Sequence, residues 1–184
     1  TANNVTVVSN VGVAPDGQSS SDRVVPVVAN LTFKELRQDV ALTNGAVYTG
    51  SIFAKYDGGY RYVQALANNL GFGTFAINYD LLSGVETAFS AGTSTVIGRG
   101  IIPYGNGWYR IWVAATAIAT IAGRLVFDII PASNSIRGVQ WASNGTSGVQ
   151  MWGAVIEPGS TASSYIPTTS GASDRTAELE TAST

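Results

Sequence analysis

Hydrophobic and polar residues alternate along most of the chain in short runs, which is the pattern of half-buried β-strands. In residues 47–56, positions 47, 49, 51 and 53 fall on one face and positions 48, 50, 52 and 54 on the other. Residues 33–40 alone have a helix-like composition, but their β-branched end favours a strand. Runs of this kind predict strands over residues 5–8, 24–29, 33–40, 47–56, 60–67, 74–79, 95–103, 108–117, 125–131 and 149–157.

Turn residues separate these runs at regular intervals. Pro15-Asp16-Gly17 combines the fixed φ of proline with the conformational freedom of glycine. Hairpin-type signals follow at Asn44-Gly45, Asp57-Gly58-Gly59, Asn106-Gly107 and Asn144-Gly145. Many short strands joined by tight turns predict an all-β protein, an antiparallel two-sheet jelly-roll sandwich.

The sandwich is expected to occupy residues 1–167, and residues 168–184 to form an extended tail or linker. This last stretch has no aromatic residue, and Leu179 is its one large aliphatic residue. Such a segment cannot bury enough apolar surface to fold alone, so we expect disorder or an arm docked on a neighbouring subunit.

Composition excludes several classes of chemistry. The chain has neither Cys nor His, which excludes disulfides, thiolate or imidazole metal sites and a Ser-His-Asp triad. With a net charge of −2 and no basic face, we expect no nucleic-acid partner. We expect no cofactor, although a structural calcium ion held by Asp16 and Asp22 is an alternative.

The ends and the longest apolar run bear on localisation. The chain begins at Thr1 and its one methionine is Met151, so we expect a processed or partly described chain. No signal-peptide pattern is visible. The run 111–122 is shorter than the ~20 residues of a membrane helix and is flanked by Arg110 and Arg124. We therefore expect no membrane partner.

Several strings in the sequence match a known pattern in order. They are Ala14-Pro15-Asp16-Gly17, the strand 47–55, Tyr79-Asp80-Leu81-Leu82-Ser83-Gly84, Gly105-Asn106-Gly107-Trp108-Tyr109-Arg110, the segment 151–160 (MWGAVIEPGS), Ser164-Tyr165-Ile166-Pro167 and Asp174-Arg175. Together they resemble a family of phage virion and tail-fibre domains that is similar to concanavalin-like and carbohydrate-binding jelly rolls. The chain departs from that pattern in lacking its opening strand and in having Val155 and Ile156 where the family has Gln and Leu.

The motif residues also have a physical interpretation of their own. Large aromatic side chains such as Trp108 and Trp152 bury extensive surface when they lie on a sheet face. We expect Arg110 to stack or pair beside them. Glu157 is expected either to pair with Arg110 or to accept backbone N–H groups, and Tyr165 and Pro167 to fold the chain end back. Structural closure is favoured over ligand contact for the whole set, which comprises Trp108, Tyr109, Arg110, Trp152, Gly153, Glu157, Tyr165 and Pro167.

No sharp catalytic pair is visible, so we expect no enzyme. Glycoside hydrolysis needs two carboxylates about 5–10 Å apart, and the best placed acids are Asp80, Glu86, Asp128 and Glu157. Asp80 is more simply a turn residue that binds its own backbone. The string 71–76 imitates a dinucleotide-binding loop, but no helix pattern follows it.

Sugar recognition is the main alternative to a purely structural role. Tyr56, Tyr60 and Tyr62 surround the Asp57-Gly58-Gly59 turn, with Gln64 nearby, and Trp141 lies in a polar loop. These side chains are candidates for an exposed aromatic platform that binds glycans. Subunit contact and simple packing within the fold remain open for the same residues.

The expected function is therefore that of a non-enzymatic bacteriophage virion structural protein, a capsid decoration (cement) protein or a head or tail fibre module. It would act at the virion surface through contacts with other virion proteins, as a homo-oligomer for which a trimer is one arrangement. The alternative is a carbohydrate-binding module, on a tail fibre that contacts host glycans or on a secreted, extracellular polysaccharide-degrading enzyme.

Overall fold

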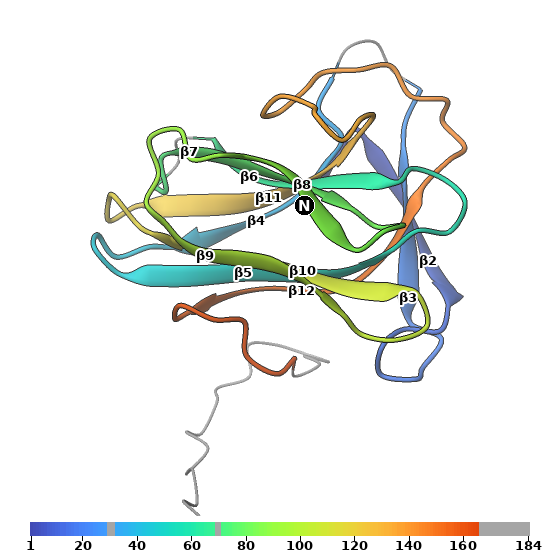
Figure 1. Cartoon of the computed structure of the whole chain (residues 1–184), viewed down its shortest axis with the longest axis horizontal. Helices are drawn as coiled ribbons and strands as arrows, with labels where there is room; N and C mark the ends of the chain where they lie inside the picture. Colours follow the sequence, from blue (N-terminus) through green and yellow to red (C-terminus); the bar gives the residue numbers. More distant parts are fainter. Residues whose placement is uncertain (29–31, 69–70, 166–184) are drawn as a thin grey trace, which may run out of the picture.

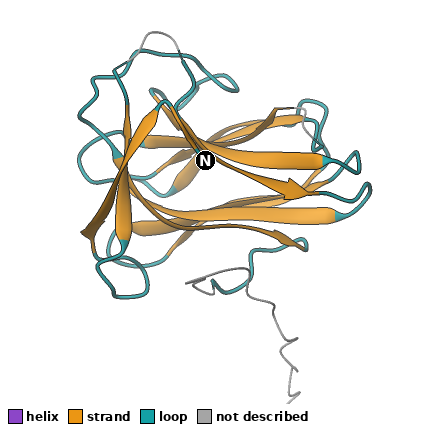
Figure 2. Ribbon diagram, turned by 180° about the vertical axis from the view of Figure 1, so that it is seen from behind, coloured by secondary structure: helices purple, strands orange, loops and turns teal. Residues whose placement is uncertain are grey.

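The computed structural model describes residues 1–28, 32–68 and 71–165. Two six-stranded antiparallel sheets pack face to face as a jelly-roll-like sandwich, which confirms the predicted fold class (Figures 1 and 2). No helix occurs among the described residues, and hence none long and apolar enough to cross a bilayer. Pro167 and the predicted tail 168–184 lie outside the described residues.

The first sheet has the strand order β1-β4-β11-β6-β7-β8. Its strands are β1 (Ala2–Asn3), β4 (Glu35–Ala41), β11 (Ala122–Ile130), β6 (Tyr62–Asn68), β7 (Thr74–Asp80) and β8 (Val85–Ser90). The second sheet has the order β2-β3-β12-β5-β10-β9. Its strands are β2 (Val5–Gly12), β3 (Ser21–Pro26), β12 (Val149–Pro158), β5 (Val47–Lys55), β10 (Trp108–Thr116) and β9 (Val96–Pro103).

The ten predicted strands are all present, with shifted ends, and two strands were not predicted. β1 has only two residues, and β8 lies at a sheet edge with most of its side chains exposed. An exposed edge strand is not constrained to carry hydrophobic residues on one face, so its alternation is weak. Residues 33–40 give strand β4 because they pair with β11, which overrides their local helix propensity.

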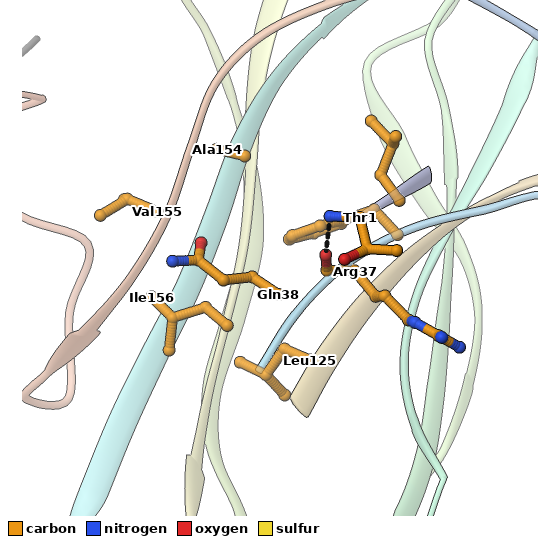
Figure 3. A pocket seen from close by; sticks show the side chains of 9 residues that line it. Thr1, Arg37, Gln38, Leu125, Ala154, Val155 and Ile156 are labelled. Carbon is orange, nitrogen blue, oxygen red and sulfur yellow. Dashed lines mark hydrogen bonds between the residues drawn. The ribbon is translucent and has the colours of Figure 1, made fainter. Parts of the chain in front are cut away.

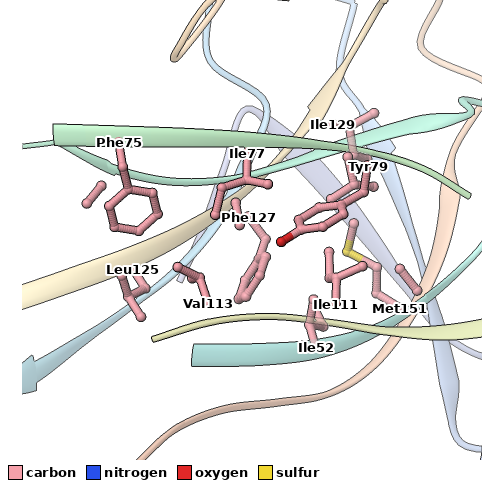
Figure 4. Close-up of a cluster of buried hydrophobic side chains, with 14 of the residues drawn as sticks. Ile52, Phe75, Ile77, Tyr79, Ile111, Val113, Leu125, Phe127, Ile129 and Met151 are labelled. Atoms are coloured by element: carbon pink, nitrogen blue, oxygen red, sulfur yellow. The ribbon is translucent and has the colours of Figure 1, made fainter. Parts of the chain in front are cut away.

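Side chains from the inner faces of both sheets form one core (Figure 4). Ile77 and Tyr79 of β7 and Phe127 of β11 meet Ile111 and Val113 of β10, and all five are buried. The Tyr79 hydroxyl donates to the Trp112 carbonyl oxygen across the sandwich at 3.1 Å. Burial of this phenol raises its pKa, so Tyr79 stays neutral and ties the two sheets together.

Two segments cover the outer faces of the sandwich. The loop from β11 to β12 lies over the first sheet, and the segment after β12 lies below the second sheet in Figure 1. Because each outer face is covered in part, side chains on both faces of both sheets are buried. These two covered faces carry the residues of functional interest.

Candidate functional site

The motif residues meet on the outer face of the second sheet. Arg110 of β10 donates from Nη2 to the Ser51 hydroxyl at 2.9 Å and from Nη1 to the Ser163 carbonyl oxygen. Its guanidinium also lies 5.2 Å from the centre of the Phe53 ring. Arg110 therefore stacks and pairs as expected, although the ring beneath it belongs to Phe53 and not to a tryptophan.

Glu157 binds the same residue, Ser163. Its Oε1 accepts from the Ser163 backbone N–H at 2.9 Å, and its Oε2 accepts from the Ser163 hydroxyl. Arg110 thus binds the carbonyl oxygen of Ser163, and Glu157 binds its N–H and hydroxyl groups. Together they fix the segment after β12 against the sheet. This arrangement supports the interpretation of the motif as structural closure.

An aromatic cluster lies beside these polar contacts. The Phe53 ring centre is 5.4 Å from that of Trp152, 6.2 Å from Tyr165 and 4.9 Å from Tyr104. Gly153 has φ 61° at a bulge in β12, and a Cβ there would lie 3.2 Å from both Phe53 and Tyr165. Glycine is needed at this position because it lets both rings approach the backbone.

A cavity of about 510 Å³ opens next to this cluster, at one end of the sandwich. One wall is the loop after β2, and the other is the β9–β10 turn. The lining residues are Val13, Ala14, Pro15 and Gly17 in the loop, Tyr104, Gly105 and Asn106 in the turn, and Gly12, Lys55, Trp108 and Gln150 in the strands. Trp108 is buried and its indole N–H donates to the Val13 carbonyl oxygen at 3.1 Å. Trp108 thereby joins the two walls.

Tyr109, the remaining residue of the Trp-Tyr-Arg string, has another role. Its ring lies against Gly84, where a Cβ would come within 2.4 Å of the ring. Gly84 has φ 70°, in the left-handed region that favours glycine. Tyr109 therefore packs the β9–β10 hairpin against the turn that follows β7.

The structure does not gather the predicted sugar-contact residues into one exposed platform. Trp141 is only 8% exposed, and its indole N–H donates to the Ile129 carbonyl oxygen at 3.1 Å. Tyr60 packs edge-on against Trp141, with ring centres 4.8 Å apart, and Tyr56 packs against the same core. The polar loop returns over the core, so a tryptophan in it becomes buried, which corrects the expectation of an exposed ring.

Gln64 and Tyr62 lie on the outer face of the first sheet. Gln64 is fully buried and donates to Asn78 Oδ1 at 2.6 Å, while its Oε1 accepts from the Gly138 backbone N–H at 2.8 Å. Tyr62 lies beside Arg61, whose guanidinium is 5.3 Å from the ring centre. Packing within the fold accounts for Gln64 and Trp141, because neither side chain is accessible to a glycan.

Two of the candidate catalytic acids, Asp80 and Glu86, are engaged by arginine side chains. Asp80 accepts from Arg61 Nε at 2.6 Å and from the Leu82 backbone N–H at 2.9 Å, and the Arg61 guanidinium holds its pKa well below the usual range. It is therefore the turn residue that the sequence indicated. Glu86 pairs with Arg99 at 3.0 Å on the surface.

Asp128 is a buried acid of a different kind. It lies opposite Glu35 in the β11–β4 register and is 1% exposed, and its Oδ1 has no hydrogen-bond partner in the described part of the chain. Burial, reinforced by the charge of Glu35, raises the pKa of Asp128 to about 8. A substrate cannot reach a carboxyl that is buried to this degree.

The two candidate calcium ligands are engaged separately, with Asp16 in the turn after β2 and Asp22 in strand β3. Asp16 Oδ1 accepts from the Gln18 backbone N–H at 2.9 Å, and Asp22 Oδ1 accepts from the Asn10 backbone N–H at 3.1 Å. Within residues 1–28, 32–68 and 71–165, no three His, Cys, Asp or Glu side chains lie close enough to hold a metal ion.

A second, smaller cavity of about 220 Å³ lies between β4 and β12, where the sandwich is open (Figure 3). Leu125, Val155 and Ile156 give it an apolar lining, and Gln38 stands at its edge. The Thr1 ammonium donates to the Arg37 carbonyl oxygen at 2.8 Å beside it. This cavity is a gap between the two sheets, lined by side chains from both of them.

Comparisons with known proteins add no relative: neither a protein-family model nor a curated protein matches this chain. The functional assignment therefore rests on geometry and on the sequence motifs.

The sequence did not predict that Tyr104, Lys55 and Gln150 line a cavity. The available signal was the position of Tyr104 immediately before the Gly105-Asn106-Gly107 turn.

Proposed function

We propose that the chain is a non-enzymatic structural protein of a bacteriophage particle, a capsid decoration protein or a head or tail fibre module at the virion surface. It acts through contacts with neighbouring subunits, as a homo-oligomer for which a trimer is one arrangement. The phage setting rests on the motif strings around Trp108 and Trp152. The absence of catalysis is supported by the acids, because Asp80 and Glu157 are bound to neighbouring groups and Asp128 is covered.

One observation carries the assembly role: β2 is an uncharged strand at a bare sheet edge. It spans Val5–Gly12 with the sequence VTVVSNVG, and among the described strands it pairs with β3 alone. Val7, Val8 and Val11 of this strand are each about 40% exposed or more. Such an edge offers backbone hydrogen-bonding groups and apolar side chains to another strand.

The edge strands on the opposite side of the sandwich differ from β2. β8 and β9 carry Glu86 and Arg99, which pair with each other, and the Arg99 guanidinium lies 3.7 Å from the Phe89 ring centre. Charges on an edge strand are a common protection against unwanted pairing. β2 lacks that protection, which supports it as the strand that meets a neighbour.

The test is a charge placed on β2. Val8→Lys should shift the wild-type oligomer towards monomer in sedimentation velocity, because a lysine opposes strand pairing. Val28→Lys, at a more exposed valine outside any strand, is the matched control and should leave association unchanged. A wild-type chain that stays monomeric at high concentration, or equal behaviour of both variants, contradicts the assembly role. Immunogold imaging of phage particles tests the virion setting separately.

Glycan binding is the second candidate function, and the cavity beside Tyr104 favours it. Tyr104 is 56% exposed, which is a large exposure for an aromatic ring. A cavity of about 510 Å³ lies within the range of small-molecule sites, about 300–1,000 Å³. This function would place the chain on a host-contacting fibre or on a secreted polysaccharide-degrading enzyme.

A further inference from the structure

We propose that the cavity between the loop after β2 and the β9–β10 turn binds an acidic saccharide, a sugar that carries a carboxylate. This inference rests on the second candidate function and adds the chemical class of the ligand. It also moves the binding site away from Tyr60 and Trp141 to residues at the end of the second sheet.

The walls of the cavity are held in place before any ligand arrives. In the loop after β2, the Ala14 backbone N–H donates to Gln18 O at 2.8 Å and the Gly17 N–H donates to Ala14 O at 3.0 Å. In the opposite turn, the Tyr104 N–H donates to Trp108 O at 2.8 Å. Binding to a preformed site avoids the entropic cost of ordering loops.

Tyr104 supplies the apolar platform. Its ring is exposed, and its edge contact with the buried Phe53 has an interplanar angle of 76°. Phe53 in turn packs on Trp152 and Tyr165. A ring supported in this way presents a rigid face on which the C–H face of a sugar can stack at small entropic cost.

Lys55 and Gln150 supply the polar contacts, and they face each other in the β5–β12 register. Lys55 forms no ion pair in the described part of the chain, and its ammonium lies 6.0 Å from the centre of the Trp108 ring. Gln150 Oε1 accepts from the Ser21 hydroxyl at 3.4 Å, which leaves its amide N–H groups as donors. An ammonium beside an amide donor is suited to a carboxylate.

Asp16, in the loop after β2, forms no ion pair with Lys55 in the described part of the chain. Asp16 turns its Oδ1 to its own loop, where it accepts from the Gln18 N–H at 2.9 Å and the Ser20 hydroxyl at 3.4 Å. The polar side chains that line the cavity are therefore Lys55, Gln150, Asn106 and the Tyr104 hydroxyl, and none of them is anionic. The lining thus favours an anionic sugar over a neutral one.

The test measures affinity by calorimetry and on a panel in which each uronate- or sialate-bearing glycan is paired with its neutral analogue. The wild-type chain should bind at least one acidic glycan about tenfold tighter than its neutral partner, which corresponds to one charge-assisted hydrogen bond. Lys55→Gln should remove this preference and leave neutral binding unchanged. Tyr104→Ala should weaken binding of both members of a pair.

Tyr62→Ala is the matched control, since Tyr62 lies on the other sheet and outside the cavity, and thermal unfolding checks that each variant folds. Equal affinity for acidic and neutral glycans, or an unchanged preference in Lys55→Gln, overturns the inference and leaves glycan binding standing. The absence of binding to any glycan overturns both. The assembly role is judged independently by the β2 variants.

Discussion

The two outer faces of the sandwich are covered in opposite ways. On the first sheet, Gln64 and Asn78 are buried side by side and bind the backbone of the covering loop, at the carbonyl oxygens of Ser133 and Ile136 among others. On the second sheet, the segment after β12 is held by the aromatic rings around Phe53 and by two ionic groups at Ser163. One cover is held by buried amides, and the other by aromatic rings and ionic groups.

This difference makes the second sheet the better suited of the two to bind a ligand. A buried network of amides loses stability when any member is left unpaired, so it tolerates little change and fixes one loop conformation. Aromatic rings supported from behind can stay partly exposed, and their exposed faces can stack on a ligand. The second sheet therefore has both the exposed Tyr104 and the cavity beside it, whereas the amides on the outer face of the first sheet are buried.

The largest effect is expected from Phe53→Ala. Phe53 is 1% exposed and contacts Tyr104, Trp152, Tyr165 and Arg110, so its removal leaves a cavity and should cost about 3–5 kcal/mol in chemical denaturation. Phe89→Ala, at an exposed phenylalanine of β8, is the control and should cost far less. Similar losses for the two variants would show that the aromatic cover contributes little to folding.

The polar cover is tested by Gln64→Met, which keeps the shape of the side chain. The change removes the partner of Asn78 Oδ1 and of the Gly138 N–H, and two buried groups left unpaired should cost about 3 kcal/mol. Hydrogen exchange should rise in the covering loop. Gln38→Met, at an exposed glutamine of β4, should have almost no effect. An unprotected loop in the wild-type chain would show that the buried amides do not hold the loop in place.

The stability of the chain should depend on pH through Asp128, which lies beside Gln64 on the outer face of the first sheet. The Asp128 carboxyl has a pKa of about 8 in the folded chain, against about 4 in an unfolded chain. Between these values the folded state holds a proton that the unfolded state has released, so stability falls as pH rises and levels off above pH 8. The fall between pH 5 and 7 should be about 2–3 kcal/mol.

Asp128→Asn should remove this slope and make the chain more stable at pH 7, as measured by denaturant unfolding at several pH values. Asp39→Asn, at an exposed acid of β4 that pairs with Arg124, is the control and should leave the slope in place. An unchanged slope in Asp128→Asn would show that Asp128 is ionised in the folded chain at neutral pH.

The fold and the candidate site differ in how far the sequence predicts them. Strand alternation and turns such as Asn106-Gly107 depend on neighbouring residues, so they predict the sandwich, and the motif predicts that Arg110 and Glu157 act together. The cavity forms where the loop at Pro15 meets the turn at Tyr104, which are distant in sequence. No local pattern records that meeting, nor the return of a polar loop that buries Trp141.

The smallest effect is expected from Glu157→Gln, which removes an ionic group that holds the segment after β12 on the second sheet. Glu157→Gln keeps one acceptor for the Ser163 N–H but removes the charge that strengthens both of its bonds to Ser163, and it should cost about 1 kcal/mol. Limited proteolysis should then cut the segment after β12 faster than in the wild-type chain. Glu86→Gln, at a surface pair, should leave that rate unchanged. If cleavage is equally slow in both variants, the rings of Trp152 and Tyr165 hold the segment by themselves, and the aromatic cover does not need its ionic groups.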